Sequence, residues 1–432
     1  MLKFFYQFFY DIIWHLFLLI YFIIYYLFAK KNKDRKKSLC DRLSIYNTLE
    51  NRNNKVLWFH GSSLGEVLSL LPLMKFLKQK FSQTQILSTS TIRGQYVAQE
   101  KSKAERIIYL PFDISYLIRS ALKKNKPDAL IIFETEIWPN LFWECSRAKI
   151  PLIIVSGRIS KRSFPKYKLA KFFFDTVLKD CIFLMQTQED IDRIIKMGAP
   201  ETKVKLCGDI KLDGLKTKLT ISEKEFLNNT FNIDETTIVA GSTHHGEEEI
   251  IVKVFEKLQK KWPKINLIIA PRHLKRIKDI QHWLNKNNYK YMLRSKLPDS
   301  KPEKIILLDT YGELSIIYYL AKIVFIGGTI TPVGGHNLLE PAAFGKPVLF
   351  GKHIDNCKKQ AQLLLNNNAG KIILTEDELE KSIDYLLSNP HKIEEMNNQS
   401  KNIITTNQGA LNKSINEIEK ILGTASNYPS LQ

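Results

Sequence analysis

Short runs of β-branched and aromatic residues alternate with amphipathic stretches from Lys55 onward. This alternation is typical of repeated βαβ units, which build a parallel sheet covered by helices. The predicted strands of a first series span residues 56–60, 85–90, 106–110, 128–133, 151–156, 181–187 and 204–208. Those of a second series span residues 237–242, 265–272, 304–310, 322–328 and 347–351. The pattern predicts two doubly wound α/β domains that face each other across a cleft, with ligands bound beyond the carboxyl ends of the strands.

The two series are separated by a polar stretch between Lys211 and Glu223, which carries no strand signal and is the predicted interdomain linker. At 432 residues the chain is also longer than one hydrophobic core usually supports. We therefore predict an N-terminal segment of residues 1–37, an N-terminal Rossmann-like domain of residues 38–215 and a C-terminal Rossmann-like domain of residues 216–432.

An apolar stretch, Ile12–Ala29, precedes both domains and contains one His and no formally charged residue. Its length of about 18 residues is the minimum for a helix that spans a bilayer. A helix tilted in the membrane interface is an alternative geometry, because the stretch is rich in Phe and Tyr and because Lys3 and Asp11 lie near one end.

The basic run Lys30–Lys37 follows the apolar stretch directly. Such a run stays on the cytoplasmic side of a membrane and favours anionic lipid headgroups. A cleavable signal peptide is disfavoured, because the charge follows the apolar residues and no small-residue cleavage site is present. We predict a single N-terminal anchor in the inner (cytoplasmic) membrane, with both domains on the cytoplasmic side.

Lys and Arg outnumber Asp and Glu by 64 to 44, which gives a formal net charge of +20. This charge predicts an anionic partner, either nucleic acid, acidic lipid or a phosphorylated substrate, although many lysines can simply solvate the surface. We expect no nucleic acid, since the sequence has no recognition helix, RNA-binding sheet signature or basic stripe interleaved with aromatics. The five cysteines form no CxxC pair and the histidines show no ligand spacing, which predicts a reducing compartment and no metal site.

The segment HGSSLGE, residues 60–66, lies between a predicted strand and a predicted helix. Gly61 and Gly65 permit a tight turn, and Glu66 falls in the first helical turn, where the helix dipole favours its ionised form. An ionised carboxylate there can act as a general base for an attacking hydroxyl group. Alternatively Ser63 and Glu66 form only a capping box that fixes the start of the helix.

The segment ETEIWPN, residues 134–140, follows the predicted strand 128–133. In an extended chain Glu134 and Glu136 face the same side, an arrangement that is costly unless a cation or a hydroxyl-rich ligand lies nearby. This spacing indicates sugar chemistry, and the alternative is a solvated turn with Trp138 packed beneath it. Lys211 can bring a positive charge to the interdomain hinge, although one lysine in a linker is a weak signal.

The segment GGTITPVGGHNLLEPAAFGKPVLFG, residues 327–351, is the most specific pattern in the chain. Gly334 and Gly335 allow the backbone to approach a ligand, and the helix that begins near HNLLEPAA can offer free N–H groups to a phosphate. Glu340, one turn into that helix, can accept hydrogen bonds from a ribose diol. A purely structural glycine turn is the alternative.

Three shorter segments also follow predicted strands of the second series: GSTHHGEEE, APRH and DTYGEL. Arg272 in APRH can offset phosphate charge. Thr310 and Glu313 in DTYGEL match a capping box, although exposed backbone groups at that turn can still read a nucleotide base.

Taken in order, these segments resemble the 3-deoxy-D-manno-octulosonic acid (Kdo) transferases of lipopolysaccharide synthesis. The resemblance is carried by HGSSLGEV, YLPFD, ETEIWPNL, GDIKLD, GSTHHGEEE, APRH, DTYGEL and the segment 327–351, and it extends from the N-terminus to beyond residue 360. It implies a GT-B fold and an inverting, metal-independent transfer without a cofactor. The implied donor is CMP-Kdo, and the implied acceptor is a tetraacylated, bisphosphorylated lipid A precursor (lipid IVA).

The resemblance also implies roles for individual residues. Glu66 matches the family's general base, and Lys211 with one of Glu134 and Glu136 matches positions that stabilise the transition state. The implied contacts to CMP come from Ser242, Thr243, Pro271, Arg272, Gly312, Glu313, Leu314, Gly334, Gly335, His336, Asn337, Leu338, Leu339 and Glu340.

Three departures from the family pattern concern the acceptor side more than the reaction. The chain has HGSSLGE where HAVSVGE is commoner, SGRIS (residues 156–160) in place of an Asn-Ala-Arg-Leu-Ser type stretch, and His245 where Glu is commoner. The alternative within enzymes is another membrane-associated GT-B transferase that uses a UDP-sugar. A basic scaffold protein with a membrane anchor is the alternative from outside the enzymes.

Overall fold

The computed structural model describes the chain except for residues 1, 29–32, 50–53, 232–235, 300–301 and 425–432. The described part forms two compact units, the first made of residues 1–214 with the C-terminal residues from 408, and the second of residues 215–407. Residues 29–32, which hold the end of the predicted apolar stretch and the start of the basic run, lie outside the described residues.

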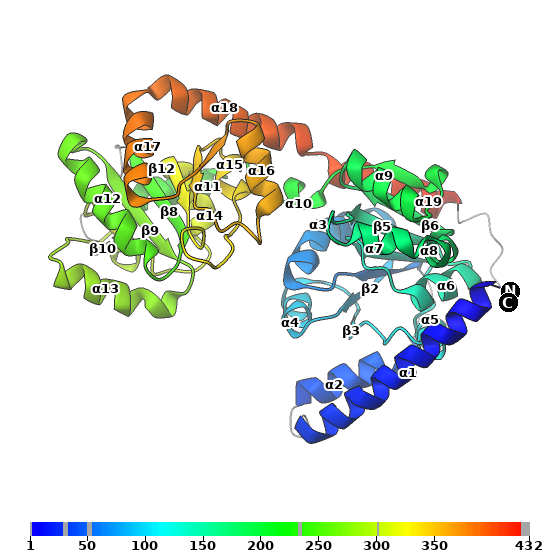
Figure 1. Cartoon of the computed structure of the whole chain (residues 1–432). Coiled ribbons are helices and arrows are strands. Elements are labelled where there is room, and N and C mark those ends of the chain that lie inside the picture. Colours follow the sequence, from blue (N-terminus) through cyan, green and yellow to red (C-terminus); the bar gives the residue numbers. More distant parts are fainter. Residues whose placement is uncertain (1, 29–32, 50–53, 232–235, 300–301, 425–432) are drawn as a thin grey trace. The chain divides into compact units, whose positions relative to one another are not determined.

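Unit 1 is built on a parallel sheet of seven strands in the order β3-β2-β1-β4-β5-β6-β7. The strands are β1 (Val56–His60), β2 (Thr84–Thr89), β3 (Arg106–Tyr109), β4 (Ala129–Phe133), β5 (Leu152–Gly157), β6 (Cys181–Met185) and β7 (Val204–Leu206). The helices are α1 (Leu2–Phe28), α2 (Lys33–Arg42), α3 (Leu64–Phe81), α4 (Ile92–Lys101), α5 (Ser115–Asn125), α6 (Pro139–Arg147), α7 (Phe164–Leu169), α8 (Lys171–Leu178), α9 (Gln188–Met197), α10 (Ile210–Asp213) and α19 (Ala410–Thr424). Helices lie on both faces of the sheet (Figure 1).

The central strands of unit 1 are buried on both faces, which is why they read as continuous apolar runs in the sequence. Trp58 packs into a core with α5, α6, α8 and α9, whereas its neighbours Leu57 and Phe59 pack into a second core with α3 and α19. Alternate side chains of β1 therefore contribute to opposite sides of one sheet.

Unit 2 repeats this architecture with the strand order β10-β11-β9-β8-β12-β13-β14, again all parallel. The strands are β8 (Thr237–Thr243), β9 (Asn266–Pro271), β10 (Met292–Leu293), β11 (Ile305–Leu307), β12 (Ala321–Ile326), β13 (Val348–Phe350) and β14 (Gly370–Ile372). The helices are α11 (Ile221–Phe231), α12 (Glu247–Lys261), α13 (Ile277–Lys286), α14 (Leu314–Ile317), α15 (Leu339–Ala343), α16 (Lys358–Asn366), α17 (Glu376–Ser388) and α18 (Pro390–Asn407). The prediction of two doubly wound α/β domains is confirmed.

The C-terminal helix departs from the predicted division into residues 38–215 and 216–432. After α18, helix α19 belongs to unit 1 (Figure 1). Ile415, Ile418 and Leu422 of α19 are buried in the core that contains α3 and β1. The sequence pattern places this helix at the end of the second series but does not show which sheet its apolar face covers.

Helix α1 packs against unit 1 and is not a separate appendage, unlike the segment expected for residues 1–37. Tyr6 and Tyr10 contact the core around α6 and α8. Gln7 is buried, and its amide donates to Asn140 Oδ1 at 3.0 Å and to Glu144 Oε1 at 2.8 Å. Side chains of α6 thus fix the N-terminal part of α1 to unit 1.

The remaining described surface of α1 carries large apolar side chains that are exposed. Phe4, Phe8 and Ile13 are 71%, 62% and 63% exposed, and Phe5, Phe9, Leu16 and Phe17 are exposed as well. Across the described ranges, no helix has both the length and the apolar composition that crossing a bilayer requires.

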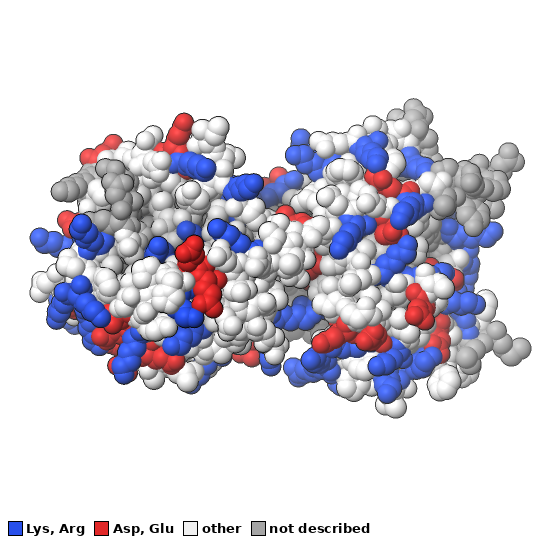
Figure 2. Space-filling model, turned by 90° about the horizontal axis from the view of Figure 1, so that it is seen from above, with Lys and Arg blue, Asp and Glu red and all other residues white. Residues whose placement is uncertain are grey.

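Charged side chains are spread over the face of the molecule shown in Figure 2. Lys and Arg are scattered across that face, with fewer Asp and Glu among them. On this face the excess of positive charge is therefore a general property of the surface.

Candidate active site

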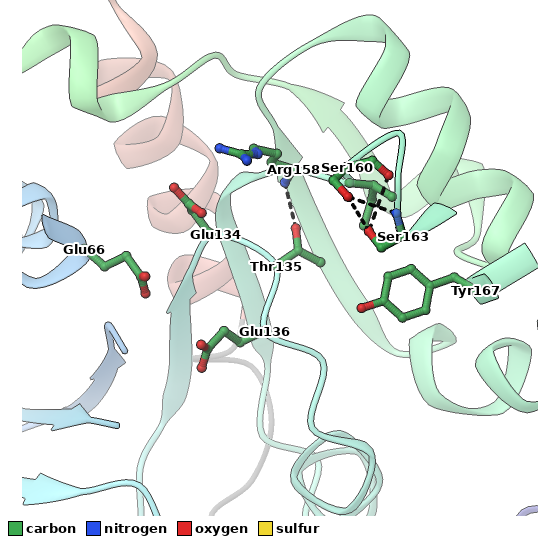
Figure 3. Close-up of a pocket in the computed structure, with 9 residues that line it drawn as sticks. Glu66, Glu134, Thr135, Glu136, Arg158, Ser160, Ser163 and Tyr167 are labelled. Atoms are coloured by element: carbon green, nitrogen blue, oxygen red, sulfur yellow. Dashed lines mark hydrogen bonds between the residues drawn. The ribbon is translucent and has the colours of Figure 1, made fainter. Parts of the chain in front are cut away.

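A cavity of about 240 Å³ opens in unit 1 beyond the carboxyl ends of β1, β4 and β5, which are neighbours in the sheet. Its lining consists of Glu66, Glu134, Thr135, Glu136, Arg158, Ile159, Ser160, Ser163 and Tyr167. The lining thus brings three carboxylates together with a guanidinium and four hydroxyl-bearing side chains (Figure 3). This lining suits a ligand with many hydroxyl groups.

Glu66 lies in the first turn of α3, directly after the loop that follows β1. Its carboxylate accepts hydrogen bonds from Ser62 N and from Ser63 Oγ, both at 2.8 Å. Ser63 is the N-cap of α3, so the capping interaction anticipated as an alternative is present. In Figure 3 the same carboxylate points toward Glu134 and Glu136. Capping and access to the cavity are therefore compatible.

The electrostatic environment of Glu66 favours proton uptake. Burial raises the pKa of Glu66, and the nearby charges of Glu136 and Glu134 raise it further, while the hydrogen bonds from Ser63 and Ser62 act in the opposite direction. A carboxylate whose pKa is raised is a stronger base than an ordinary glutamate. The two serines hold its oxygen atoms in place.

Glu134 follows β4 and has a positive φ of 57°, a conformation that costs a non-glycine residue about 1 kcal/mol or more. Its carboxylate accepts a hydrogen bond from Lys211 Nζ at 2.5 Å. Lys211 lies in α10, which is tied to the end of β5 because Ile210 N donates to Ser156 Oγ at 2.9 Å. Hydrogen bonds therefore connect Lys211 and Glu134 to the end of β5 within unit 1.

Glu136 forms a second pair, with His60. His60 is fully buried at the end of β1, and its Nε2 lies 2.9 Å from Glu136 Oε2. Trp138 Nε1 donates to the same oxygen at 3.1 Å. Burial pushes the pKa of Glu136 upward, but the bonds from His60, Ser62 and Trp138 outweigh it and hold that pKa below its ordinary value. Glu136 is therefore ionised where Glu66 is more readily protonated.

In unit 2 the predicted nucleotide-binding residues follow neighbouring strands. Ser242 and Thr243 end β8, and Pro271 ends β9. Arg272 comes next, and its N–H donates to Thr243 O at 3.0 Å, which joins the two strand ends. The glycine turn 334–335 follows β12, the other neighbour of β8.

The glycine turn requires its glycines. Gly334 and Gly335 have φ values of 101° and 81°. A Cβ atom on Gly334 would lie 2.7 Å from Asn356 Nδ2, and one on Gly335 would lie 2.6 Å from Cys357 Sγ. Both the conformation and the space therefore exclude larger residues.

The start of the following helix differs from the prediction that its N–H groups are free for a phosphate. Helix α15 has only five residues, Leu339–Ala343. Leu338 N donates to Gln360 Oε1 at 2.8 Å, and Leu339 N donates to Asn337 Oδ1 at 3.1 Å. Glu340 accepts from Asn337 Nδ2 at 3.0 Å. The amide side chains of Gln360 and Asn337 therefore occupy these two donors.

Glu247 organises the loop after β12. It is fully buried, and its carboxylate accepts hydrogen bonds from the backbone N–H groups of His244, Gly328, Thr329, Ile330 and Thr331. Its neighbour Glu248 is held by Arg276 at 2.8 Å. Two acidic residues of GSTHHGEEE therefore support the site and do not face a ligand.

The turn 312–314 follows β11, on the far side of β9 from β8. The capping box considered for Thr310 and Glu313 is wrong, because the Glu313 carboxylate accepts from Arg294 Nε at 2.7 Å. Leu314 begins α14, and Gly312 has a φ of 82°. All the predicted nucleotide-binding positions thus follow strands of one sheet, at the carboxyl ends of those strands.

Comparison with known proteins identifies the family. The family model described as 3-deoxy-D-manno-octulosonic-acid transferase (kdotransferase) matches residues 37–214. Over 334 residues, the chain is 32% identical to the 3-deoxy-D-manno-octulosonic acid transferase of Aquifex aeolicus. The match covers 77% of this chain and 86% of that protein. The chain belongs to the Kdo transferase family. It is therefore a glycosyltransferase.

Two further comparisons concern a longer relative and the fold. The chain is 36% identical over 354 residues to a bifunctional glycosyltransferase/methyltransferase of Fusobacterium nucleatum, and the match covers 80% of this chain and 55% of that protein. The chain thus spans about half the length of that relative. The crystal structure of UDP-GlcNAc 2-epimerase from Neisseria meningitidis is 17% identical, covers 85% of this chain and all of its own, and gives a TM-score of 0.57. This likeness supports the GT-B fold.

The four predicted catalytic residues of this Kdo transferase are brought together, but not as the spacing suggested. The left-handed conformation of Glu134 replaces the extended chain from which a shared direction of Glu134 and Glu136 was expected. Each carboxylate instead has its own cationic or donor partner, Lys211 for Glu134 and His60 for Glu136.

Several residues that line the cavity, and His60 beside it, are given no role by the sequence analysis. His60 stands at the end of an apolar strand and before a glycine, a position that could have marked it. Ser160, Ser163 and Tyr167 lie in a loop and a short helix that carry no such pattern. No group of three or more His, Cys, Asp or Glu residues arranged to hold a metal occurs within the described residues.

Proposed function

We propose that this Kdo transferase transfers Kdo from CMP-Kdo to a lipid A precursor, lipid IVA, in lipopolysaccharide synthesis, with inversion at the anomeric carbon. The observation that carries the proposal is the convergence of Glu66, the Glu134–Lys211 pair and the Glu136–His60 pair on one cavity. Membership of the family supports the sugar, and the hydroxyl-rich lining supports a sugar acceptor.

In the proposed reaction, Glu66 takes the proton from the attacking hydroxyl of the acceptor. The resulting oxygen nucleophile bonds to the anomeric carbon of Kdo, and the bond between that carbon and the phosphate oxygen of CMP breaks. The electron pair leaves with the phosphate, so CMP is the second product. A raised pKa suits Glu66 to this step, because it accepts the proton more readily than an ordinary glutamate.

The cationic side chains supply the charge stabilisation in this proposal. Lys211 is held against Glu134 beside the cavity, and Arg158 lines it. Fixed cations of this kind stabilise charge that develops in the transition state without reorganising. We propose accordingly that neither a metal nor a cofactor takes part.

Helix α1 is proposed to lie in the membrane interface on the cytoplasmic side of the inner membrane. Gln7 fixes the helix to unit 1, while the remaining described surface of the helix exposes large apolar side chains such as Phe4, Phe8 and Ile13. Aromatic and aliphatic side chains on one side of a helix favour the boundary between headgroups and acyl chains. An enzyme seated there reaches an amphiphilic acceptor without extracting it from the bilayer.

The test is a transfer assay with the purified full-length chain. Detergent-dispersed lipid IVA is incubated with CMP-Kdo, and in parallel with a UDP-sugar such as UDP-N-acetylglucosamine. Mass spectrometry of the lipid is expected to show the mass of one or more Kdo residues with CMP-Kdo and no change with the UDP-sugar. Transfer from the UDP-sugar alone would overturn the proposal in favour of another GT-B activity.

A further inference from the structure

Two histidines from different segments of unit 2 share a hydrogen bond. His244 follows β8, and His336 lies in the glycine turn after β12. Their Nε2 atoms are 2.8 Å apart, and their rings are parallel to within 5° with centroids 5.1 Å apart. The ring of His273, after β9, meets that of His244 edge-on at 5.7 Å. The imidazole rings of His244, His273 and His336, which follow the neighbouring strands β8, β9 and β12, therefore lie close together.

The surrounding backbone is shaped to admit this pair. Gly328 has a φ of 68°, and a Cβ atom there would lie 3.1 Å from His336 Cδ2 and 3.3 Å from His244 Cδ2. The turn at Gly334 and Gly335 likewise has no space for side chains, and it directly precedes His336, the partner of His244. Both rings remain partly exposed, so a ligand can reach them.

The hydrogen bond limits how the pair can be protonated. One Nε2 must carry a proton and the other must offer its lone pair, because two N–H groups would repel each other. The pair can therefore exist as a neutral unit or as a single cation with the proton between the rings. Burial lowers the pKa of both rings, that of His336 to about 4, so the pair is neutral at pH 7 in the absence of an anion.

The charged groups that face the pair come from several elements. Arg272 and His273 after β9 and Arg276 before α13 oppose protonation, while Glu247 and Glu248 of α12 favour it. The two carboxylates are already engaged, Glu247 by backbone N–H groups and Glu248 by Arg276. The net charge of the groups around the pair is therefore positive or zero, which disfavours protonation of the histidines. The negative charge of a bound phosphate would instead favour their protonation.

We propose that the His244–His336 pair belongs to the phosphate subsite for the nucleotide and takes up one proton when CMP binds. The inference rests on the proposed function, because it assumes that unit 2 binds CMP. It assigns His244, a residue outside the predicted set, to the same subsite as Arg272 and His336. It also supplies polar hydrogens to the phosphate where the first N–H groups of α15 are occupied.

The charge changes in transfer give the pair a role beyond affinity. The phosphodiester of the donor carries one negative charge, and the released monoester carries nearly two at neutral pH. The electron pair of the broken bond stays on the phosphate oxygen, the acceptor's proton goes to Glu66, and the histidine pair draws its own proton from solvent. The pair is therefore protonated more fully with the product CMP than with the donor.

Calorimetric titration of CMP into the full-length chain at pH 7.5 measures the proton directly. The observed enthalpy is plotted against the ionisation enthalpy of several non-phosphate buffers, and the slope gives the protons taken up. The wild type is expected to take up about one proton. His244→Gln and His336→Gln should bring the slope close to zero, whereas His245→Gln, which changes the adjacent exposed histidine, should keep it.

Two further arms keep the outcome decisive. Cytidine, which lacks the phosphate, should bind without proton uptake. In the wild type alone, the Kd for CMP should rise about tenfold per pH unit above neutrality, because one proton is linked to binding. CMP binding with no linked proton, or with the same slope in His244→Gln as in His245→Gln, would overturn this inference alone. Absence of CMP binding in the wild type would overturn the donor assignment together with it.

Discussion

The strand ends of the two units treat charge in different ways. In unit 1, acidic groups face the cavity and each has its own partner: serine donors for Glu66, Lys211 for Glu134 and His60 for Glu136. In unit 2, the acidic groups Glu247 and Glu248 are turned inward to support loops, and histidines and arginine remain toward the ligand side. The carboxyl ends of the strands therefore carry carboxylate bases in unit 1 and side chains that can bind anions in unit 2.

Under the proposed function, this contrast divides the transfer reaction between two units of the same architecture. A parallel sheet fixes only where loops emerge, so the chemistry depends on which residues follow each strand. A carboxylate in the nucleotide subsite would repel phosphate, and an unpaired carboxylate in the acceptor cavity would be costly to bury.

Glu247→Ala should disrupt unit 2 more than any change on its surface. It leaves several buried N–H groups of the loop 328–331 without an acceptor, each at a cost of about 1–3 kcal/mol. We expect a loss of more than about 3 kcal/mol in the free energy of unfolding, together with loss of CMP binding. Glu249→Ala, two residues along the same helix and partly exposed, is the matched control. Equal stability of the two variants in denaturant titration would contradict a supporting role for Glu247.

Lys211→Met tests whether the cation of unit 1 acts in the reaction. We expect kcat to fall by about 10²–10³-fold, as for loss of one fixed electrostatic partner in a transition state. The Kd for CMP should stay within about twofold, because Lys211 belongs to unit 1. Lys205→Met removes another ion-paired lysine of the same unit and should leave kcat unchanged. A parallel loss in both variants would assign the effect to stability.

The pH dependence of kcat/KM distinguishes the neighbours of Glu66, because replacing them should shift the pKa of Glu66 in opposite directions. In the proposed reaction activity needs ionised Glu66, so we expect activity to be present above the raised pKa of Glu66 and lost as the pH falls through it. Glu136→Gln removes a charge that raises this pKa, so the acid limb should move to lower pH. Ser63→Ala removes a hydrogen bond that lowers it, so the limb should move to higher pH, with about 1 kcal/mol of cap stability lost. Shifts in the same direction would exclude Glu66 as the titrating group.

The sequence predicts the framework of both units well, because parallel strands buried on both faces leave long apolar runs. Only the short edge strands β10 and β14, of two and three residues, have no such run and were missed. Helix α19 was assigned to the second domain because its apolar face, including Ile418, does not reveal which sheet it covers.

The sequence predicts several residues of the candidate site, but it does not predict which side chains these residues pair with. Glu66 and Lys211 stand in segments that carry the family resemblance, whereas the pairing of Glu136 with His60 depends on β1 and β4 being neighbours. The occupied N–H groups at Leu338 and Leu339 likewise depend on Gln360 and on the rotamer of Asn337. Such contacts arise from packing between segments far apart in the chain.

The central claim, that Glu66 is the base and that nucleotide binding is a separate property of unit 2, is tested most directly by Glu66→Gln. Turnover of CMP-Kdo with lipid IVA and the Kd for CMP are measured on the same preparation. Our account predicts that turnover falls by about 10²–10⁴-fold while the Kd for CMP is unchanged. Normal turnover in a folded Glu66→Gln variant would contradict it.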